Sequence, residues 1–378
     1  MKNLIHLSIL VALVLWLGAC EQKKTVEPSG KTVRIGIIAP FSGAHYAKGK
    51  EGLSGMETAR QLQPYLQNGD RIEWVVEDDR NDPGLTVQAL KKLTEKNKVA
   101  AIITFSSSNP VLAMAKVADD YQAPILAALA THPAVTRGNG FISQLCFDDD
   151  FQGTVAALYV RDELLIDKVA VFSDPDDSYS RYLAATFESK FKSIGGEITD
   201  RIYVTEKTGD MFKIIESVRS KTPELFYLPI FANDVLRIIR EVRKLRWELK
   251  MMGSDGLISN MLASHREELD LVEGMMATDV FAHGMPLTPF GKRTIEKHKG
   301  PRTHFAGLGA EGYALLLDAL NRCSDQRDRK CVNHQLRSTN NFTGMAGKIS
   351  IGTDGKARRP LCIDSIHNGL SKFIVKVH

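Results

Sequence analysis

The sequence lacks the features that mark membrane-spanning, metal-binding and nucleic-acid-binding proteins. Its longest apolar stretch, residues 4–17, is shorter than the about twenty residues that a membrane-spanning helix needs. Only 5 of 378 residues are cysteine, and neither a C-x-x-C pair nor a paired histidine spacing predicts a metal site. A net charge of +4, evenly spread, argues against nucleic acid as a partner. We also find no G-x-S-x-G or other nucleophile motif, so we predict neither catalysis nor a cofactor.

The N-terminus combines a positive charge at Lys2, a short apolar run and the residues LGAC ending at Cys20. This order is typical of a secretory signal, and its small-small-Cys ending resembles a bacterial lipobox. We predict a lipoprotein signal peptide at residues 1–19 and a lipid on Cys20. The alternative is an ordinary signal peptide that happens to end in cysteine. Residues 20–31 are polar, contain proline and glycine, and read as a flexible tether.

Beyond the tether, short β-branched runs alternate with helical patterns of ten to fifteen residues. This alternation predicts parallel sheets covered on both faces, and two such series predict an α/β fold with two doubly wound lobes. The expected strands are 33–40, 71–78, 99–104, 124–127, 168–172, 197–204, 224–228, 249–252 and 274–281. The expected helices are 49–66, 83–97, 109–121, 179–194, 210–220, 234–247 and 304–323.

An ordered series of short motifs carries a family resemblance. The motifs are IGIIAPFSG at 35–43, EDD at 77–79, SSS at 106–108, ATHP at 130–133, GSDG at 253–256 and GTDG at 352–355. Together they resemble the type I periplasmic binding proteins, in the leucine/isoleucine/valine-binding branch. The resemblance implies two parallel-sheet lobes joined by a three-strand hinge. It places lobe 1 at 32–146 and 279–346, and lobe 2 at 147–278 and 347–378.

The same resemblance implies a function. We expect a monomeric, lipid-anchored protein of the cell envelope, facing the periplasm, that captures an amino acid or a related small molecule between its lobes. It would deliver this ligand to the permease of an ABC importer and catalyse nothing. Two alternatives remain open. One is a sensor that reports its ligand to a signalling receptor, and the other is an envelope protein-binding factor with a vestigial cleft; an extracytoplasmic hydrolase is a remote third.

The serines after the expected strand 99–104 form the best physical candidate for a ligand site. Hydroxyls of Ser107 and Ser108 at a helix N-terminus, with free backbone N–H groups, suit a carboxylate. The alternative is that Ser108 or Asn109 only caps the helix. By resemblance, Ser108 would hold the ligand carboxylate, helped by Thr131 and the backbone of Leu129.

Two further candidates rest on the resemblance. Asp255 matches an acidic position that holds an amino acid's ammonium group, and the alternative is an ordinary turn aspartate. Tyr179 matches a tyrosine that closes over the ligand from lobe 2, and the alternative is packing on a helix face.

The chain also departs from its relatives at three expected pocket positions. Lys48 stands where relatives often have an aromatic ring, and Phe231 stands where they have a lobe-2 tyrosine. Glu311 stands where a tyrosine is usual, unless the alignment slips to Tyr313. We hypothesise that Lys48 and Glu311 make the pocket more polar than a leucine site. The alternative is that one or both face solvent at the rim of the cleft.

Four cysteines remain if Cys20 carries lipid. An even number outside the cytoplasm suggests disulfides. Cys323 and Cys331 bracket a short polar loop and are the candidates for one bond, which leaves Cys146 with Cys362, although all three connectivities stay open. The GLGAEG sequence at 307–312 matches a dinucleotide-binding motif, but no convincing strand precedes it, so we expect small-residue packing near a helix start.

Overall fold

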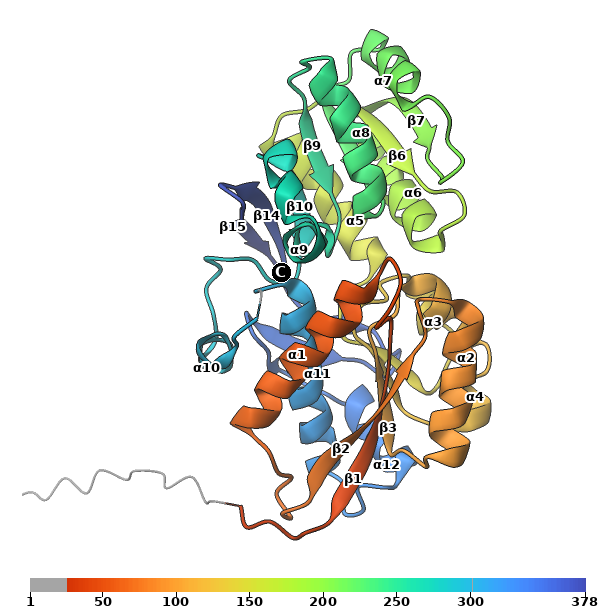
Figure 1. Cartoon of the computed structure of the whole chain (residues 1–378), viewed down its shortest axis with the longest axis vertical. Coiled ribbons are helices and arrows are strands. Elements are labelled where there is room, and N and C mark those ends of the chain that lie inside the picture. Colours follow the sequence, from red (N-terminus) through yellow and green to blue (C-terminus); the bar gives the residue numbers. More distant parts are fainter. Residues whose placement is uncertain (1–25, 301) are drawn as a thin grey trace, which may run out of the picture.

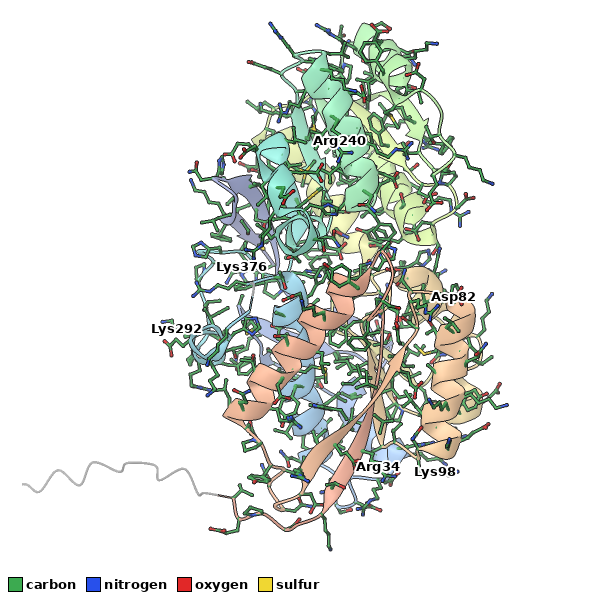
Figure 2. The ribbon with its side chains drawn as sticks, in the orientation of Figure 1. Arg34, Asp82, Lys98, Arg240, Lys292 and Lys376 are labelled. Carbon is green, nitrogen blue, oxygen red and sulfur yellow. A yellow bond between two sulfur atoms is a disulfide. The ribbon has the colours of Figure 1, made fainter. Side chains whose placement is uncertain are left out.

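Two parallel sheets organise the chain into two lobes stacked along the long axis of the molecule (Figure 1). The computed structural model describes residues 26–300 and 302–378. The expected signal peptide and Cys20 lie outside these residues. Within the described part, no helix is long and apolar enough to cross a membrane. Charged side chains such as Arg34, Lys98, Arg240 and Lys292 project from the exterior of both lobes (Figure 2).

Lobe 1 contains a five-stranded parallel sheet of order β2-β1-β3-β4-β5. Its strands are β1 (Thr32–Ala39), β2 (Arg71–Asp78), β3 (Ala101–Thr104), β4 (Ile125–Ala127) and β5 (Ile142–Gln144). Successive β1 side chains point to opposite faces of the sheet. Ile35 and Ile37 pack in the core under α1 and α11, and Ile38 packs in the core under α2 and α3. The near-continuous apolar runs of the sequence therefore become strands buried on both sides.

The helices of lobe 1 cover both faces of this sheet (Figure 1). They are α1 (Tyr46–Leu62), α2 (Pro83–Lys91) with a π-helical turn (Lys92–Lys96), α3 (Ser108–Ala115), α4 (Ala118–Tyr121), a 3₁₀ turn (Pro133–Val135), α10 (Pro289–Lys297), α11 (His304–Asn321) and α12 (Arg329–Arg337). Glycines bring α1 and α11 into close contact. A Cβ on Gly55 would lie 1.9 Å from the Ala306 carbonyl oxygen, and one on Gly309 would lie 2.0 Å from that of Gly52. The GLGAEG motif therefore serves helix packing, as predicted.

Lobe 2 contains a seven-stranded sheet of order β15-β14-β10-β9-β8-β6-β7. Its strands are β6 (Lys168–Ser173), β7 (Glu197–Tyr203), β8 (Leu225–Leu228), β9 (Lys250–Gly253), β10 (Met276–Asp279), β14 (Leu361–His367) and β15 (Leu370–Val377), of which the last two are antiparallel. Its helices are α5 (Asp149–Leu158) with a π-helical turn (Tyr159–Glu163), α6 (Ser178–Ser193), α7 (Met211–Ser220), α8 (Ala232–Lys244), α9 (Leu257–Ser264) and a 3₁₀ segment (Arg266–Val272). Both lobes are doubly wound, which confirms the predicted fold class.

The chain passes between the lobes three times: after β5, after β10 and before β14 (Figure 1). A small antiparallel sheet, β11 (Phe342–Thr343), β12 (Lys348–Ile351) and β13 (Ala357–Arg358), precedes the third crossing. We predicted that residues from 347 onward belong to lobe 2. The stretch 347–360 contacts lobe 1, because the Gln144 N–H donates to the Gly355 carbonyl at 2.8 Å and Arg359 donates to the Leu145 carbonyl at 3.3 Å. The same stretch also reaches lobe 2, because Lys356 pairs at 2.6 Å with Asp148, the N-cap residue of α5.

The cysteine prediction is half right. Cys323 and Cys331 form a disulfide with their Cα atoms 6.0 Å apart, which confirms that pair. Cys146 and Cys362 are buried and unbonded, so the leftover pairing was wrong. Cys146 follows the first crossing strand and Cys362 lies on β14, so each packs in the core as a small apolar side chain.

Candidate functional site between the lobes

The strand orders bring the candidate residues to one place. In lobe 1 the order reverses at β1 and β3, and in lobe 2 it reverses at β6 and β8. Ligands of open α/β sheets bind beyond the carboxyl ends of the strands at such switch points. A cavity of about 70 Å³ lies there, small beside the ~300–1,000 Å³ of sites for drug-sized ligands. Seven predicted residues line it: Lys48, Ser107, Ser108, Leu129, Tyr179, Phe231 and Asp255.

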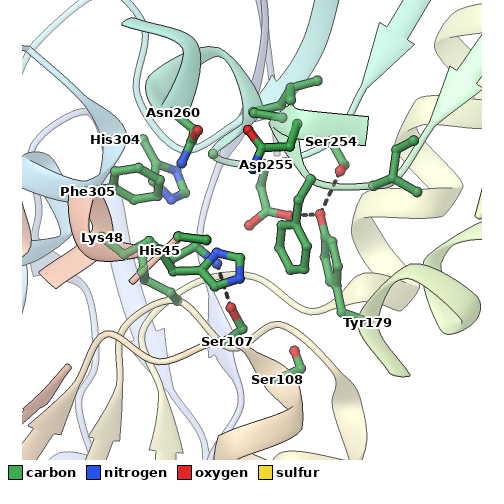
Figure 3. A pocket seen from close by; sticks show the side chains of 18 of the residues that line it. His45, Lys48, Ser107, Ser108, Tyr179, Ser254, Asp255, Asn260, His304 and Phe305 are labelled. Atoms are coloured by element: carbon green, nitrogen blue, oxygen red, sulfur yellow. Dashed lines mark hydrogen bonds between the residues drawn. The ribbon is translucent and has the colours of Figure 1, made fainter. Parts of the chain in front are cut away.

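Lys48 brings a positive charge into this cavity from α1. Its side chain is buried, and its Nζ donates to the Ser107 Oγ at 2.5 Å (Figure 3). The ammonium also lies 4.5 Å from the centre of the Phe231 ring. Among the described residues Lys48 has no ion-pair partner within 4 Å. Burial lowers the pKa of Lys48 to about 8, against the pull of more distant carboxylates, of which Asp177 acts most strongly.

Asp255 brings the opposite charge from the loop after β9. Its Oδ1 accepts hydrogen bonds from the Tyr179 hydroxyl at 2.7 Å and from the Gln152 amide at 2.8 Å. Its Oδ2 accepts no hydrogen bond from any described residue, and the side chain lies in the cavity wall (Figure 3). Burial raises the pKa of Asp255, and the charge of the His304 ring is the largest influence in the opposite direction. The site therefore offers one open carboxylate oxygen.

The serines stand at the N-terminus of α3, which begins at Ser108, one residue before our prediction. Ser107 occupies the N-cap position, yet its side chain makes no capping hydrogen bond. Its hydroxyl accepts from Lys48 instead, and the Ser108 Oγ accepts from the His132 N–H at 3.3 Å. Because the first N–H groups of a helix carry partial positive charge, α3 adds to the field of Lys48 at this end of the cavity.

The two lobes touch each other around the cavity. Asn109 of α3 accepts a hydrogen bond from the Ser178 N–H of α6 at 3.0 Å, and its amide donates to the Asp176 carbonyl at 3.4 Å. The rings of His45 and Phe231 meet edge to face at 4.8 Å. Contacts of this kind form when hinged lobes close, so the structure represents a closed arrangement.

Two predicted site residues lie elsewhere. Glu311 lines neither the cavity nor its rim; it is buried in α11, where it pairs with Arg359 at 2.7 Å and accepts from the Met345 N–H at 2.6 Å. Its charge holds the residues before β14 against lobe 1. Thr131 is also buried outside the cavity lining, and its carbonyl accepts from the Asp149 N–H at 3.0 Å, at the first crossing. We hypothesised that Lys48 and Glu311 both make the pocket polar, and of these two residues only Lys48 lines the cavity.

Sequence reasoning missed several polar cavity residues, namely His45, Asn260, His265 and His304. Burial, reinforced by the charge of Lys48, lowers the pKa of His45 to about 3, so this ring is neutral. The Nδ1 of His304 makes a hydrogen bond to Asp279. Single histidines have no spacing pattern, and the only available signal was their position at a helix end: His45 before α1, His265 after α9 and His304 at the start of α11.

Comparison with known proteins agrees with this arrangement. A sequence profile described as "Periplasmic binding protein" matches residues 32–368. The chain belongs to the periplasmic binding protein family. Within the family it is a type I protein of the leucine/isoleucine/valine-binding branch, as its motifs indicated. Proteins of this family are solute-binding proteins rather than enzymes.

Relatives of this periplasmic binding protein come from several bacteria. An "amino acid binding protein" of Pseudomonas aeruginosa is 26% identical over 75% of this chain and 74% of its own. A "Leu/Ile/Val-binding protein homolog 1" of Brucella suis is 25% identical over 87% and 88%. Among solved structures, the leucine binding protein LivK of Thermotoga maritima has a TM-score of 0.84 and 28% identity, covering 91% of this chain and 98% of its own.

Proposed function

We propose that this protein captures an α-amino acid in its zwitterionic form. The ligand carboxylate would meet Lys48, Ser107, Ser108 and the N-terminus of α3, and its ammonium group would meet the free Oδ2 of Asp255. The observation that carries the proposal is the presence of two opposite charges, Lys48 and Asp255, in one small closed cavity. The names of the Pseudomonas and Brucella relatives support an amino acid as the ligand class.

The buried state of Lys48 gives this proposal a physical basis. An ammonium group removed from water is costly unless a charged partner and hydrogen bonds compensate it. Ser107 supplies one hydrogen bond, and the Phe231 ring supplies a weaker attraction. A ligand carboxylate would supply the missing counter-charge, and charge-assisted hydrogen bonds are about twice as strong as neutral ones.

The proposal extends to transport and location. We propose that the closed, loaded form docks on the permease of an ABC importer, and that a lipid on Cys20 keeps the protein at the envelope membrane. The family and the LGAC sequence support both statements. A Cys20→Ser variant should leave the membrane fraction and appear as a soluble protein. Equal membrane retention of both forms would contradict the anchor and leave the ligand proposal intact.

Isothermal titration with the twenty protein amino acids tests the ligand proposal. The wild-type protein should bind at least one of them, and Asp255→Asn should weaken that ligand about ten- to a hundredfold, because the ammonium loses its charged partner. The matched simple carboxylate, which lacks the amino group, should bind both forms equally. An unchanged affinity for the amino acid in Asp255→Asn would remove the proposed role of this carboxylate.

A further inference from the structure

His304 is a buried, rigidly held side chain in the cavity wall that the proposed function does not use. It begins α11, and its side chain is only 1% exposed. Its backbone N–H donates to the Ser259 Oγ at 2.7 Å, and its Nδ1 makes a hydrogen bond to Asp279. His304 belongs to lobe 1, and two residues of lobe 2, Ser259 on α9 and Asp279 on β10, hold it in place.

The other ring nitrogen is free. No described residue makes a hydrogen bond to Nε2 of His304, and a Cβ built on the cavity residue Gly256 would lie 3.5 Å from this atom. Figure 3 places His304 and Asn260 on the side of Asp255 away from Tyr179 and Ser254. The ring thus presents a polar atom to a part of the cavity that the carboxylate and ammonium subsites do not occupy.

Carboxylate side chains surround the His304 ring. Asp279 lies on β10 beside Asp364 of β14, and burial together with the charge of Asp279 raises the pKa of Asp364 well above its usual range. The hydrogen bond between Nδ1 and Asp279 fixes the orientation of the His304 ring, so Nε2 is the ring atom left for a bound ligand. The Asp255 carboxylate lines the same cavity.

We propose that His304 determines ligand specificity through a hydrogen bond between its Nε2 and the polar group at the end of the side chain of the bound amino acid. This inference rests on the proposed function and narrows it: the ligand is an acidic amino acid or its side-chain amide. The amide of Asn260, on the same side of the cavity, supplies a second polar contact for such a group.

An apolar side chain fits this arrangement poorly. Leucine or isoleucine would displace water from Nε2 without replacing its hydrogen bond, and an unsatisfied buried polar atom is costly. Sites built to make a hydrogen bond to a substrate reject analogues that lack the partner more strongly than apolar pockets reject a missing methylene. His304 would therefore separate this protein from leucine-binding relatives at the same place in the fold.

The experiment measures affinities of glutamate, aspartate, glutamine, asparagine and leucine for the wild type, His304→Leu and His304→Gln. We expect the wild type to prefer at least one of the first four over leucine by about tenfold or more. His304→Leu should weaken that ligand by about ten- to a hundredfold and leave leucine within threefold of the wild type. His304→Gln, which retains a polar side chain able to make a hydrogen bond, should recover part of the loss. Comparing the acids with their amides shows whether the ring selects a carboxylate or an amide group.

Two outcomes would overturn this inference separately from the proposed function. If leucine binds the wild type as tightly as the polar amino acids, the role of His304 is wrong and the amino-acid site stands. If His304→Leu weakens all ligands equally, the ring supports the fold and does not select the ligand. A folded wild type that binds no α-amino acid would instead overturn the proposed function and the inference together.

Discussion

The ammonium of Lys48, on lobe 1, lies 4.5 Å from the centre of the Phe231 ring, on lobe 2. Both residues line the cavity. This contact joins the two lobes through a buried charge that lacks an ion-pair partner among the described residues. Lys48 therefore reduces the stability of the empty protein while it prepares the cavity for an anionic group.

Replacing Lys48 with methionine should separate these two effects. The substitution keeps the length of the side chain and removes its charge, so the melting temperature of the empty protein should rise by a few degrees. Affinity for the ligand should fall at least tenfold, because its carboxylate loses the counter-charge. Lys50→Met, an exposed position on the same helix, serves as the control and should change neither quantity. A destabilised Lys48→Met protein with unchanged affinity would show that Lys48 only supports the fold.

The pKa of Lys48 predicts how binding and stability respond to pH. Burial lowers this pKa from 10.5 to about 8, so the folded protein releases the proton first. Affinity for a carboxylate ligand should therefore fall as pH rises from 8 to 9, by up to about tenfold per unit. Between pH 8 and 10.5 the unfolded chain binds more protons than the folded one, so the contribution of Lys48 to stability rises with pH.

Titration calorimetry between pH 7 and 9 measures this response. Lys48→Arg is the matched control, since arginine keeps its charge throughout this range and its affinity profile should stay flat. A wild-type profile as flat as that of Lys48→Arg would contradict the assignment of Lys48 to the carboxylate subsite.

Glu311 is expected to act on stability alone. Its buried ion pair with Arg359 holds the residues before the third crossing to α11. Glu311→Gln leaves Arg359 buried without its counter-charge and should lower the free energy of unfolding by about 3–5 kcal/mol, measured by urea denaturation. Replacing both residues with methionine should recover much of this loss. The order of ligand preference should not change, and a changed order would restore Glu311 to the site.

The sequence predicted the fold well because each lobe repeats a local pattern. Buried runs such as that around Ile37 are apolar on both faces, and helices of ordinary length separate them. Site residues that follow a parallel strand were also predictable. Ser107 follows β3, one of the two strands at the lobe 1 switch point, where ligands of open α/β sheets bind. Asp255 follows β9, the neighbour of the switch-point strand β8, and the resemblance pointed to it.

Residues placed by long-range pairing were not predictable. The partner of Glu311 is 48 positions away on the last stretch before β14, and no local pattern links them. The role of His304 depends on Asp279, which is 25 residues distant and reaches it only through the second crossing. The resemblance aligned Glu311 with a pocket position, but in this chain its carboxylate is buried and pairs with Arg359.

The disulfide between Cys323 and Cys331 should make a measurable contribution to stability. The two residues are 8 positions apart, and closing so short a loop in the unfolded chain corresponds to about 2–3 kcal/mol. Reduction, or a Cys323→Ser/Cys331→Ser variant, should lower the melting temperature by several degrees.

Burial raises the pKa of Cys146 and Cys362 well above the usual range, so neither thiol should react with a labelling reagent before unfolding. Rapid labelling of either thiol in the native protein would contradict the packing described for the crossings.

The central claim is that this periplasmic binding protein holds a zwitterionic amino acid between Lys48 and Asp255. The most direct test is a thermal-shift screen of the twenty amino acids against the wild type and a Lys48→Met/Asp255→Asn double variant. A ligand at a hundred times its dissociation constant should stabilise the wild type by about 2.7 kcal/mol, a shift of several degrees. The account predicts such a shift in the wild type and none in the double variant. Equal shifts in both proteins, or no shift in a folded wild type, would contradict it.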